Sequence, residues 1–240
     1  MFLKSISFLL LLVGLSSVTH AAAYWLEIKG IGKINTEVVV EIIYGNIDEQ
    51  GIRHRQQGKE LVLTGDFKFN VITPSGKKIP VAMHMKSDYW TFSYLPKEQG
   101  VYRIVGINAT HPVIDRSKTG GENVLPIDYL CAQYTVGSAH NSPMPEQFLD
   151  IIADWVGKSV KISAFNNNAP AKAGVKLRVF NPENWEKELV LDEKGEANFW
   201  PTLKGMYMIR QDWISKKSGT YLDIPYTSVR HRCNYCFFLN

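Results

Sequence analysis

The sequence predicts an all-β fold built as two tandem Ig-like β-sandwich domains. Three observations carry this prediction. Hydrophobic and polar side chains alternate in short runs, turn-forming residues bound those runs, and one pattern of aromatic, Pro and Gly residues occurs twice. The composition, 45% hydrophobic and 21% charged, is typical of a globular protein and excludes global disorder.

The strands expected in the first half follow from period-two alternation. Apolar side chains recur at every second position over 37–44, 66–71 and 90–94, and a turn is expected over 73–77. A strand directs successive side chains to opposite faces, so each run predicts a half-buried strand. Residues 111–126 form a long polar loop before the last strand of this half, which includes 129–136.

The second half contains similar runs. Residues 175–179 alternate as a strand, whereas 146–155 are compatible with either a short helix or an entry strand. A terminal strand is expected over 229–239, with its odd-numbered side chains facing inward. Cys233 and Cys236 would then lie on opposite faces and could not pair with each other. Cys131 could pair with either one in an oxidising compartment, or all three could stay as thiols.

One corner motif occurs in both halves. An aromatic residue is followed by Pro two positions later, Gly six later and Tyr eight later, starting at Tyr94 and again at Phe199. Pro ends strand pairing, Gly permits a tight corner, and a Tyr beyond the corner can bond the corner backbone, as in sandwich domains. Upstream, residues 71–74 match 179–182, and each segment ends in Pro. We therefore expect two domains of similar build.

The chain divides accordingly. Residues 1–23 have the pattern of a secretory signal peptide, with Lys4, an apolar run over 8–15 and small residues that allow cleavage before Ala22 or Tyr24. The first sandwich is expected over 24–137, a polar linker over 138–148 and the second sandwich over 149–240. The mature protein is expected in the periplasm or secreted. No later stretch reaches the length of a membrane helix.

Charge and motifs exclude several function classes. The formal charge of +4 is too mild to predict binding to nucleic acid. The sequence has no nucleophile elbow, no phosphate-binding loop and no zinc motif. We therefore expect a protein that binds rather than catalyses.

Parts of the chain resemble a bacterial periplasmic family linked to nickel and cobalt uptake, a domain of unknown function. The resemblance lies in 22–45, with its Tyr-Trp-Leu-Glu segment, in 67–77 and in the corner over 90–102. Residues 170–210 are similar to that family's second module, an Ig-like or carboxypeptidase-regulatory-like sandwich. The resemblance implies a non-enzymatic accessory protein that handles a divalent metal and works with a metal-uptake membrane transporter.

Candidate metal ligands are few. His84 and Met85 offer imidazole and thioether groups, which suit copper, and imidazole also suits nickel. The resemblance adds cobalt as a possible metal. His140 and Met144 lie in the linker, and His231 lies on the terminal strand. The competing interpretations are a surface His beside core methionines at 83–85 and a hydrogen-bonded structural His at 231.

The tryptophans suggest an alternative function. Trp185 and Trp213 are flanked by polar residues and are the best candidates for exposed rings. Exposed aromatic rings bind sugars and peptides by stacking. These two residues would then serve a glycan-binding or adhesion module of the cell envelope, although packing in a core also accounts for them.

Overall fold

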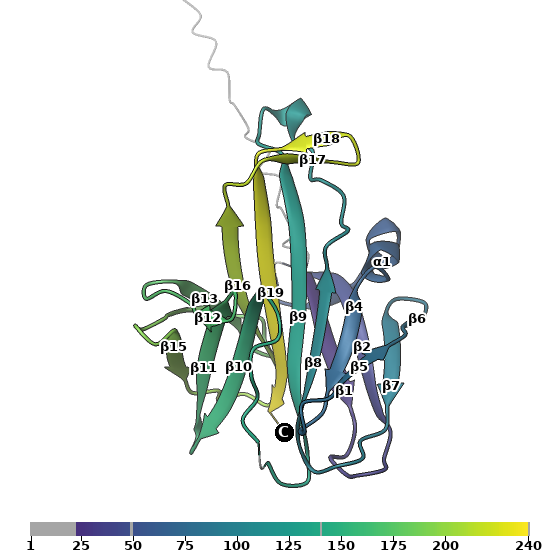
Figure 1. Cartoon of the computed structure of the whole chain (residues 1–240), viewed down its shortest axis with the longest axis vertical. Helices are drawn as coiled ribbons and strands as arrows, with labels where there is room; N and C mark the ends of the chain where they lie inside the picture. The colour runs from purple at the N-terminus through teal and green to yellow at the C-terminus, as the bar shows by residue number, and fades with distance from the viewer. Residues whose placement is uncertain (1–22, 49, 140, 240) are drawn as a thin grey trace, which may run out of the picture.

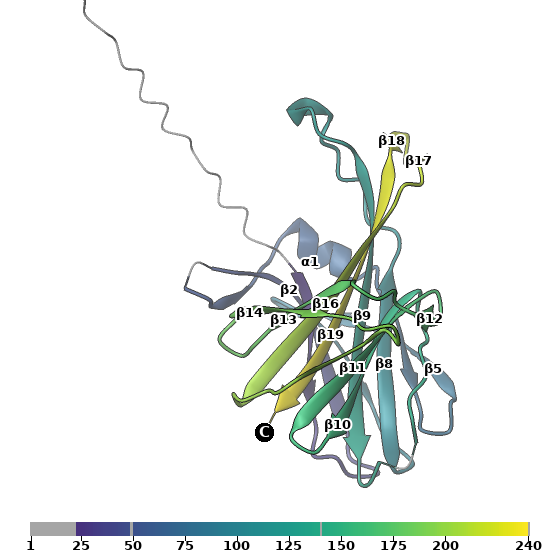
Figure 2. The same cartoon turned by 90° about the vertical axis from the view of Figure 1, so that its left-hand side faces the viewer.

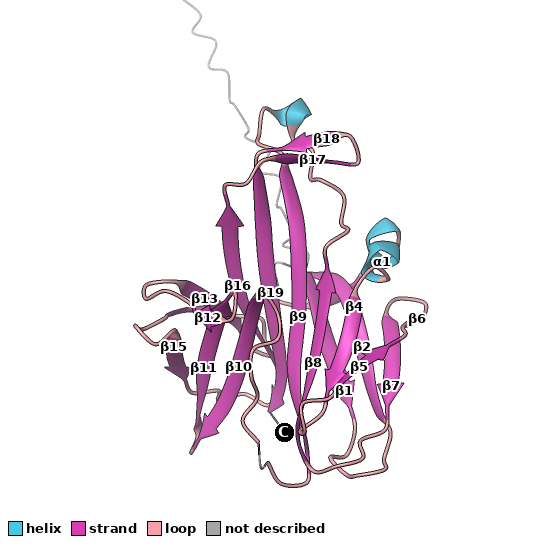
Figure 3. Ribbon diagram, in the orientation of Figure 1, coloured by secondary structure: helices cyan, strands magenta, loops and turns pink. Residues whose placement is uncertain are grey.

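The computed structural model describes residues 23–48, 50–139 and 141–239, and nearly all of its regular structure is β (Figures 1 and 3). The expected all-β sandwich fold is confirmed. The predicted leader, apart from Ala23, lies outside the described residues. Within those residues, no helix has both the length and the apolar character needed to span a bilayer.

The first half forms two packed sheets. One sheet contains β1 (Ala23–Lys29), β2 (Val38–Ile47), β3 (Arg53–Arg55), β6 (His84–Met85) and β7 (Trp90–Tyr94). The strands opposite are β4 (Lys68–Ile72), β5 (Lys78–Val81), β8 (Gly100–Asn108) and β9 (Val124–Val136). A short helix, α1 (Lys59–Thr64), precedes β4, and the long polar loop carries a 3-10 turn at Ser117–Thr119.

The second half repeats this plan. One sheet contains β10 (Leu149–Val156), β11 (Ser159–Asn166), β12 (Ala169–Pro170) and β15 (Glu196–Phe199). The strands opposite are β13 (Lys176–Phe180), β14 (Glu186–Val190), β16 (Gly205–Ser215) and β19 (Ser228–Leu239). A separate hairpin, β17 (Gly219–Tyr221) and β18 (Ile224–Tyr226), connects β16 to β19.

The two halves join edge to edge. Strand β19 pairs in parallel with β9, from Ser228 opposite Val124 to Cys236 opposite Ala132. This seam gives one sheet of eight strands in the order β14-β13-β16-β19-β9-β8-β4-β5. Figure 2 shows the two long strands running side by side through the centre of the molecule. The two sandwiches therefore share a continuous sheet, which the sequence did not predict.

The two cores lie on opposite faces of this central sheet. Leu130 and Ala132 of β9 pack under the sheet formed by β1 and β2. Tyr129 and Cys131, which alternate with them, pack under the sheet of β10 and β11. Because β9 and β19 are parallel neighbours and the covering sheets lie on opposite faces, a pseudo-two-fold axis along the seam relates the halves.

The corner motif has the same geometry in both halves. Gly100 and Gly205 open β8 and β16 with φ of 130° and 126°, a region that side chains with a β-carbon rarely adopt. A β-carbon on Gly100 would lie 2.7 Å from Pro74, and one on Gly205 would lie 2.9 Å from Pro182. Each Gly therefore lets its strand start against the Pro of the matched upstream segment.

The structure decides one local alternative and corrects two expectations. Residues 146–155 contain most of β10, so the entry strand is the correct one of the two alternatives. The last strand of the first half begins at Val124, inside the expected 111–126 loop. On β19 the even-numbered side chains are not all exposed: Asn234 and Cys236 are 2% and 1% exposed, because β1 packs over that face of the strand.

Candidate functional site: a charged pocket at the start of β1

A pocket lies where β1 begins, between the two sheets of the first half, and has a volume of about 240 Å³. Its wall comes from β1, β2, α1, β9, β19 and the loop after β8. We call it the charged pocket, and it is lined by Ala23, Tyr24, Tyr44, Glu60, His111, Ile114, Asp128, Arg230 and Arg232.

Strand alternation directs the charged side chains toward this pocket. Asp128 shares a face of β9 with the core residues Leu130 and Ala132, and lies two residues before them. Arg230 and Arg232 share the equivalent face of β19 with Asn234. The pocket therefore lies where the apolar core of the first half gives way to polar residues.

Asp128 is buried in the pocket without a direct partner. It is 6% exposed, and within the described residues no hydrogen bond or ion pair engages its carboxylate. Burial raises the pKa of the Asp128 carboxyl, and the positive charges of Arg230 and Arg232 oppose that rise. A buried carboxylate with no contacting partner is costly, so the site favours a positively charged or hydrogen-donating ligand group.

Arg230 places a positively charged group at the pocket that also lacks a hydrogen-bond partner at one atom. Burial lowers the pKa of its guanidinium, Arg232 lowers it further, and Asp128 opposes both. Its Nε atom is buried and has no hydrogen-bond partner in the described part of the chain. A guanidinium has five N–H donors suited to carboxylate or phosphate oxygens, so Arg230 can receive an anionic group.

Tyr24 supplies a third unsatisfied group. Its hydroxyl is buried and makes no hydrogen bond to any described residue, although the side chain as a whole is 6% exposed. Burial raises the pKa of Tyr24, so the phenol stays protonated at neutral pH. The hydroxyl can therefore donate a hydrogen bond to a ligand as well as accept one.

The other charged side chains at the pocket already have partners. Arg232 Nε donates to Asp212 Oδ1 at 2.7 Å. His111 Nε2 lies 3.6 Å from Glu60 Oε2. Among the polar side chains of the pocket, those of Asp128, Arg230 and Tyr24 are therefore the ones with groups available to a ligand.

Pseudo-symmetry shows why a cavity exists here. Three pairs of cross-strand partners occupy equivalent places in the two halves. Val38–Tyr94 of the first half corresponds to Val160–Phe199 of the second, Leu26–Ile42 corresponds to Ile151–Ala164, and Gly100–Val136 corresponds to Gly205–Leu239. Counting along these strands, Ala23 corresponds to Phe148 and Asp128 to His231. The Phe148 ring lies 4.6 Å from the His231 ring, centroid to centroid. An aromatic side chain therefore covers the second-half position that small Ala23 leaves open.

The described members of the predicted metal-ligand set lie apart from one another. His84 and the 54% exposed Met85 lie on β6 at one end of the first sheet, and Met144, 68% exposed, lies in the linker. His140 lies outside the described residues. No group of three or more His, Cys, Asp or Glu able to hold a metal ion occurs among the described residues. Of the predicted ligands, those that the structure describes therefore form no such group with one another.

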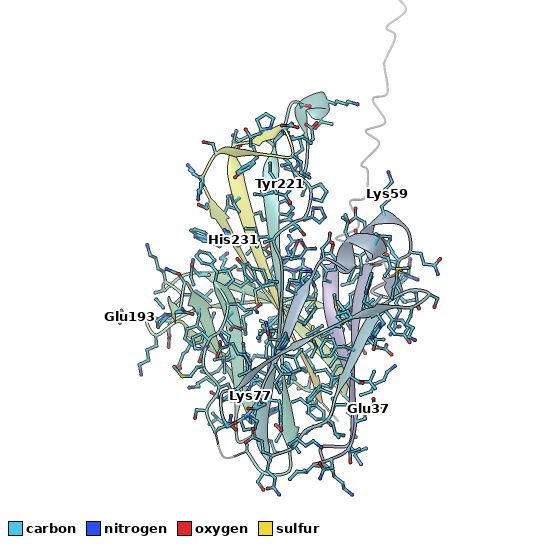
Figure 4. All side chains as sticks on the ribbon, turned by 45° about the vertical axis from the view of Figure 1, so that its right-hand side comes forward. Glu37, Lys59, Lys77, Glu193, Tyr221 and His231 are labelled. Atoms are coloured by element: carbon cyan, nitrogen blue, oxygen red, sulfur yellow. The ribbon has the colours of Figure 1, made fainter. Side chains whose placement is uncertain are left out.

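His231 is enclosed by aromatic rings. Figure 4 labels His231 on the ribbon. Its Nδ1 lies 3.0 Å from the Tyr129 hydroxyl, and its ring packs against those of Phe148 and Trp213. Burial lowers the pKa of His231 to about 4, so the ring is neutral at pH 7. These contacts fit the structural interpretation that the sequence left open.

The two predicted surface tryptophans differ in environment. Trp185 is 74% exposed beside the start of β14, whereas Trp213 is 36% exposed and its ring packs against Phe148 and His231. Trp185 lies in the turn before β14 and Trp213 lies on β16, with β13 between these two strands in the sheet. Of these two rings, that of Trp185 is the more accessible.

Comparisons with known proteins provide no assignment. No protein-family model matches the sequence, and no curated protein matches it. Dimeric latent PorU from Porphyromonas gingivalis aligns over 87% of this chain at 11% identity with a TM-score of 0.21, and this chain spans 20% of PorU. A group B streptococcus pilus 2b backbone protein aligns over 88% of this chain and 97% of its own length, at 8% identity and a TM-score of 0.16. Both scores are too low to support an argument.

Proposed function

We propose that this protein is an exported, non-catalytic binding component of the cell envelope, and that the charged pocket is its ligand site. The observation that carries the proposal is the group of polar atoms around one cavity: the buried Arg230 Nε and Tyr24 hydroxyl have no hydrogen-bond partner among the described residues, and the Asp128 side chain is 6% exposed. Such groups reduce folding stability unless they bind something. Periplasmic or secreted localisation follows from the leader pattern of the sequence.

A ligand screen tests this function. The exported protein is purified, its amino-terminal residue is determined by mass spectrometry, and its thermal unfolding is followed with small charged compounds, sugars and divalent metals. We expect a ligand that raises the midpoint in the wild type but not in Asp128→Asn. The control is Glu186→Gln, because Glu186 pairs with Arg178 on the surface away from the pocket. If a ligand raises the unfolding midpoint equally in Asp128→Asn and Glu186→Gln, it binds outside the charged pocket.

The resemblance supports a more specific role, in which the protein handles nickel or cobalt for a membrane transporter. This role rests on the resemblance rather than on a cluster of ligands among the described residues. Calorimetric titration with nickel, cobalt and copper tests it directly. Micromolar binding that is lost in His84→Ala, His140→Ala or His231→Ala would support the role, and no binding would oppose it.

Glycan binding or adhesion is the second candidate, and the exposed ring of Trp185 favours it. A glycan array with the wild type and Trp185→Ala tests this candidate. Ring-dependent binding is the expected result. Trp213→Ala is the control, because that ring is packed against its neighbours.

A further inference from the structure

The charged pocket holds two opposite charges that face one cavity without meeting. In the parallel register Arg230 lies opposite Pro126, so Asp128 is its diagonal neighbour on the adjacent strand. No ion pair joins Arg230 to Asp128 in the described structure, although each charge affects the pKa of the other. A ligand between them can contact both.

Each charge selects a different ligand group. Asp128 accepts hydrogen bonds and attracts a cation, which makes an ammonium group its natural partner. Arg230 attracts an anion and offers paired N–H donors that fit a carboxylate. The Tyr24 hydroxyl, which lacks a partner, can bond either end of the same ligand.

A simple ion fits this arrangement poorly. A divalent cation near Asp128 and Glu60 would be repelled by Arg230 and Arg232, which line the same wall. A simple anion near the arginines would be repelled by the two carboxylates for the same reason. A molecule that carries both charges avoids both penalties.

The cavity has room for a small molecule. Its volume of about 240 Å³ equals roughly eight water molecules at about 30 Å³ each, which is enough for a molecule of amino-acid size. We propose that the charged pocket binds a small zwitterion, with its ammonium group toward Asp128 and its carboxylate toward Arg230.

This inference rests on the proposed function, and calorimetry with matched probes tests it. The probes are glycine, 4-aminobutyrate, acetate, methylammonium and nickel chloride. We expect one of the two zwitterions to bind at least about tenfold more tightly than acetate or methylammonium, a difference of about 1.4 kcal/mol. Comparing the two zwitterions shows which charge separation fits the pocket.

Three variants locate the binding. Asp128→Asn and Arg230→Gln should each weaken zwitterion binding at least tenfold, whereas the control Glu186→Gln should leave it unchanged. Tyr24→Phe removes only an unpaired hydroxyl, so it should fold normally and still weaken binding. Circular dichroism and thermal unfolding confirm that each variant is folded.

The possible outcomes distinguish a failure of the zwitterion assignment from a failure of the proposed function. If acetate, methylammonium or nickel binds as tightly as the zwitterions in a manner that depends on Asp128 or Arg230, the pocket is a ligand site but the zwitterion assignment is wrong. If the zwitterions bind and no pocket variant alters their affinity, the assignment to this pocket is wrong. If no probe or screened compound binds the wild type, the proposed function fails as well.

Discussion

Tyr102 and Tyr207 occupy equivalent positions in the two halves, and each anchors the corner that precedes its strand. The Tyr102 hydroxyl donates to the Glu98 carbonyl at 3.0 Å and accepts from the Lys97 and Glu98 amides at 3.2 and 3.1 Å. The Tyr207 hydroxyl accepts from the Leu203 amide at 2.9 Å. The corner motif of the sequence therefore corresponds to two tyrosine corners.

The hydrogen bonds of these corners predict unequal losses of stability. Removing a hydroxyl that hydrogen-bonds partly buried backbone groups costs about 1–3 kcal/mol. We expect Tyr102→Phe to lower the free energy of unfolding by about 2 kcal/mol and Tyr207→Phe by about 1 kcal/mol. Urea denaturation measures both. Equal losses, or a larger loss at Tyr207, would contradict this ranking of the two corners.

Local patterns in the sequence predicted much of the fold. Period-two alternation located β7 at its exact limits and β2, β4, β13 and β19 within a few residues. The seam between β9 and β19 was not predictable in this way. It pairs segments about a hundred residues apart. The alternation of apolar and polar side chains in these strands is the same whether their hydrogen-bonding edges face solvent or each other.

The charged pocket escaped sequence analysis for a related reason. Arg230 and Arg232 fell in the set of β19 side chains interpreted as facing away from the core, and Asp128 preceded the strand as predicted. The burial of Asp128 and the partial burial of the two arginines depend on β1, which lies far away in the sequence and packs across the seam. A buried charge is recognisable only once the covering element is known. The sequence did contain one signal of this pocket: charged residues interrupt strand ends that are otherwise apolar.

An ion pair between the halves provides the second prediction. The guanidinium of Arg103 on β8 pairs with the carboxylate of Asp150 on β10, and Arg103 also donates to the Ile151 carbonyl at 2.8 Å. Both side chains are at most 3% exposed. We expect Asp150→Ala to cost about 3–5 kcal/mol, because it leaves a buried cation unpaired.

The matched control for that pair is on the surface. Arg178 and Glu186 form an ion pair whose side chains are 37% and 40% exposed. Glu186→Ala should cost less than about 1 kcal/mol, because solvent screens the pair. Urea denaturation compares the two variants, and similar losses would mean that the pair between the halves contributes no more than a surface contact.

The thiols provide the third prediction: Cys131, Cys233 and Cys236 stay reduced. The sulfurs of Cys131 and Cys233 lie 3.5 Å apart, but the two residues are diagonal neighbours across the seam. Because Cys131 lies opposite Tyr235 and Cys233 opposite Tyr129, the backbones would have to shift to bring the two cysteines to the roughly 5.5 Å between α-carbons that is typical of a disulfide. Cys236 faces the opposite core, where its Sγ accepts from the Leu26 amide at 3.4 Å.

Thiol reactivity checks this prediction. Burial raises the pKa of Cys236 to about 12 and also raises that of Cys233, so neither supplies thiolate at neutral pH. We expect no reaction with a thiol reagent in the native protein and three equivalents in denaturant. An intact mass lower by two hydrogens, with a cross-linked Cys131–Cys233 peptide, would contradict it.

The last prediction concerns pH, and it follows from the burial of His231. Its pKa is lowered to about 4 in the folded protein from 6.5 in the unfolded chain. The unfolded state therefore binds more protons between these values, and folding stability falls as the pH drops through this window. His231 contributes its full stabilising effect only above about pH 6.5.

Thermal unfolding between pH 4 and pH 7 measures this contribution. We expect the wild type to lose stability toward pH 4 more steeply than His231→Gln, whose side chain does not titrate. His84→Gln is the control, because His84 is exposed on β6, and it should follow the wild type. If the His231→Gln curve runs parallel to the wild type over the whole range, the imidazole does not remain neutral among Tyr129, Phe148 and Trp213, and another group causes the acid sensitivity.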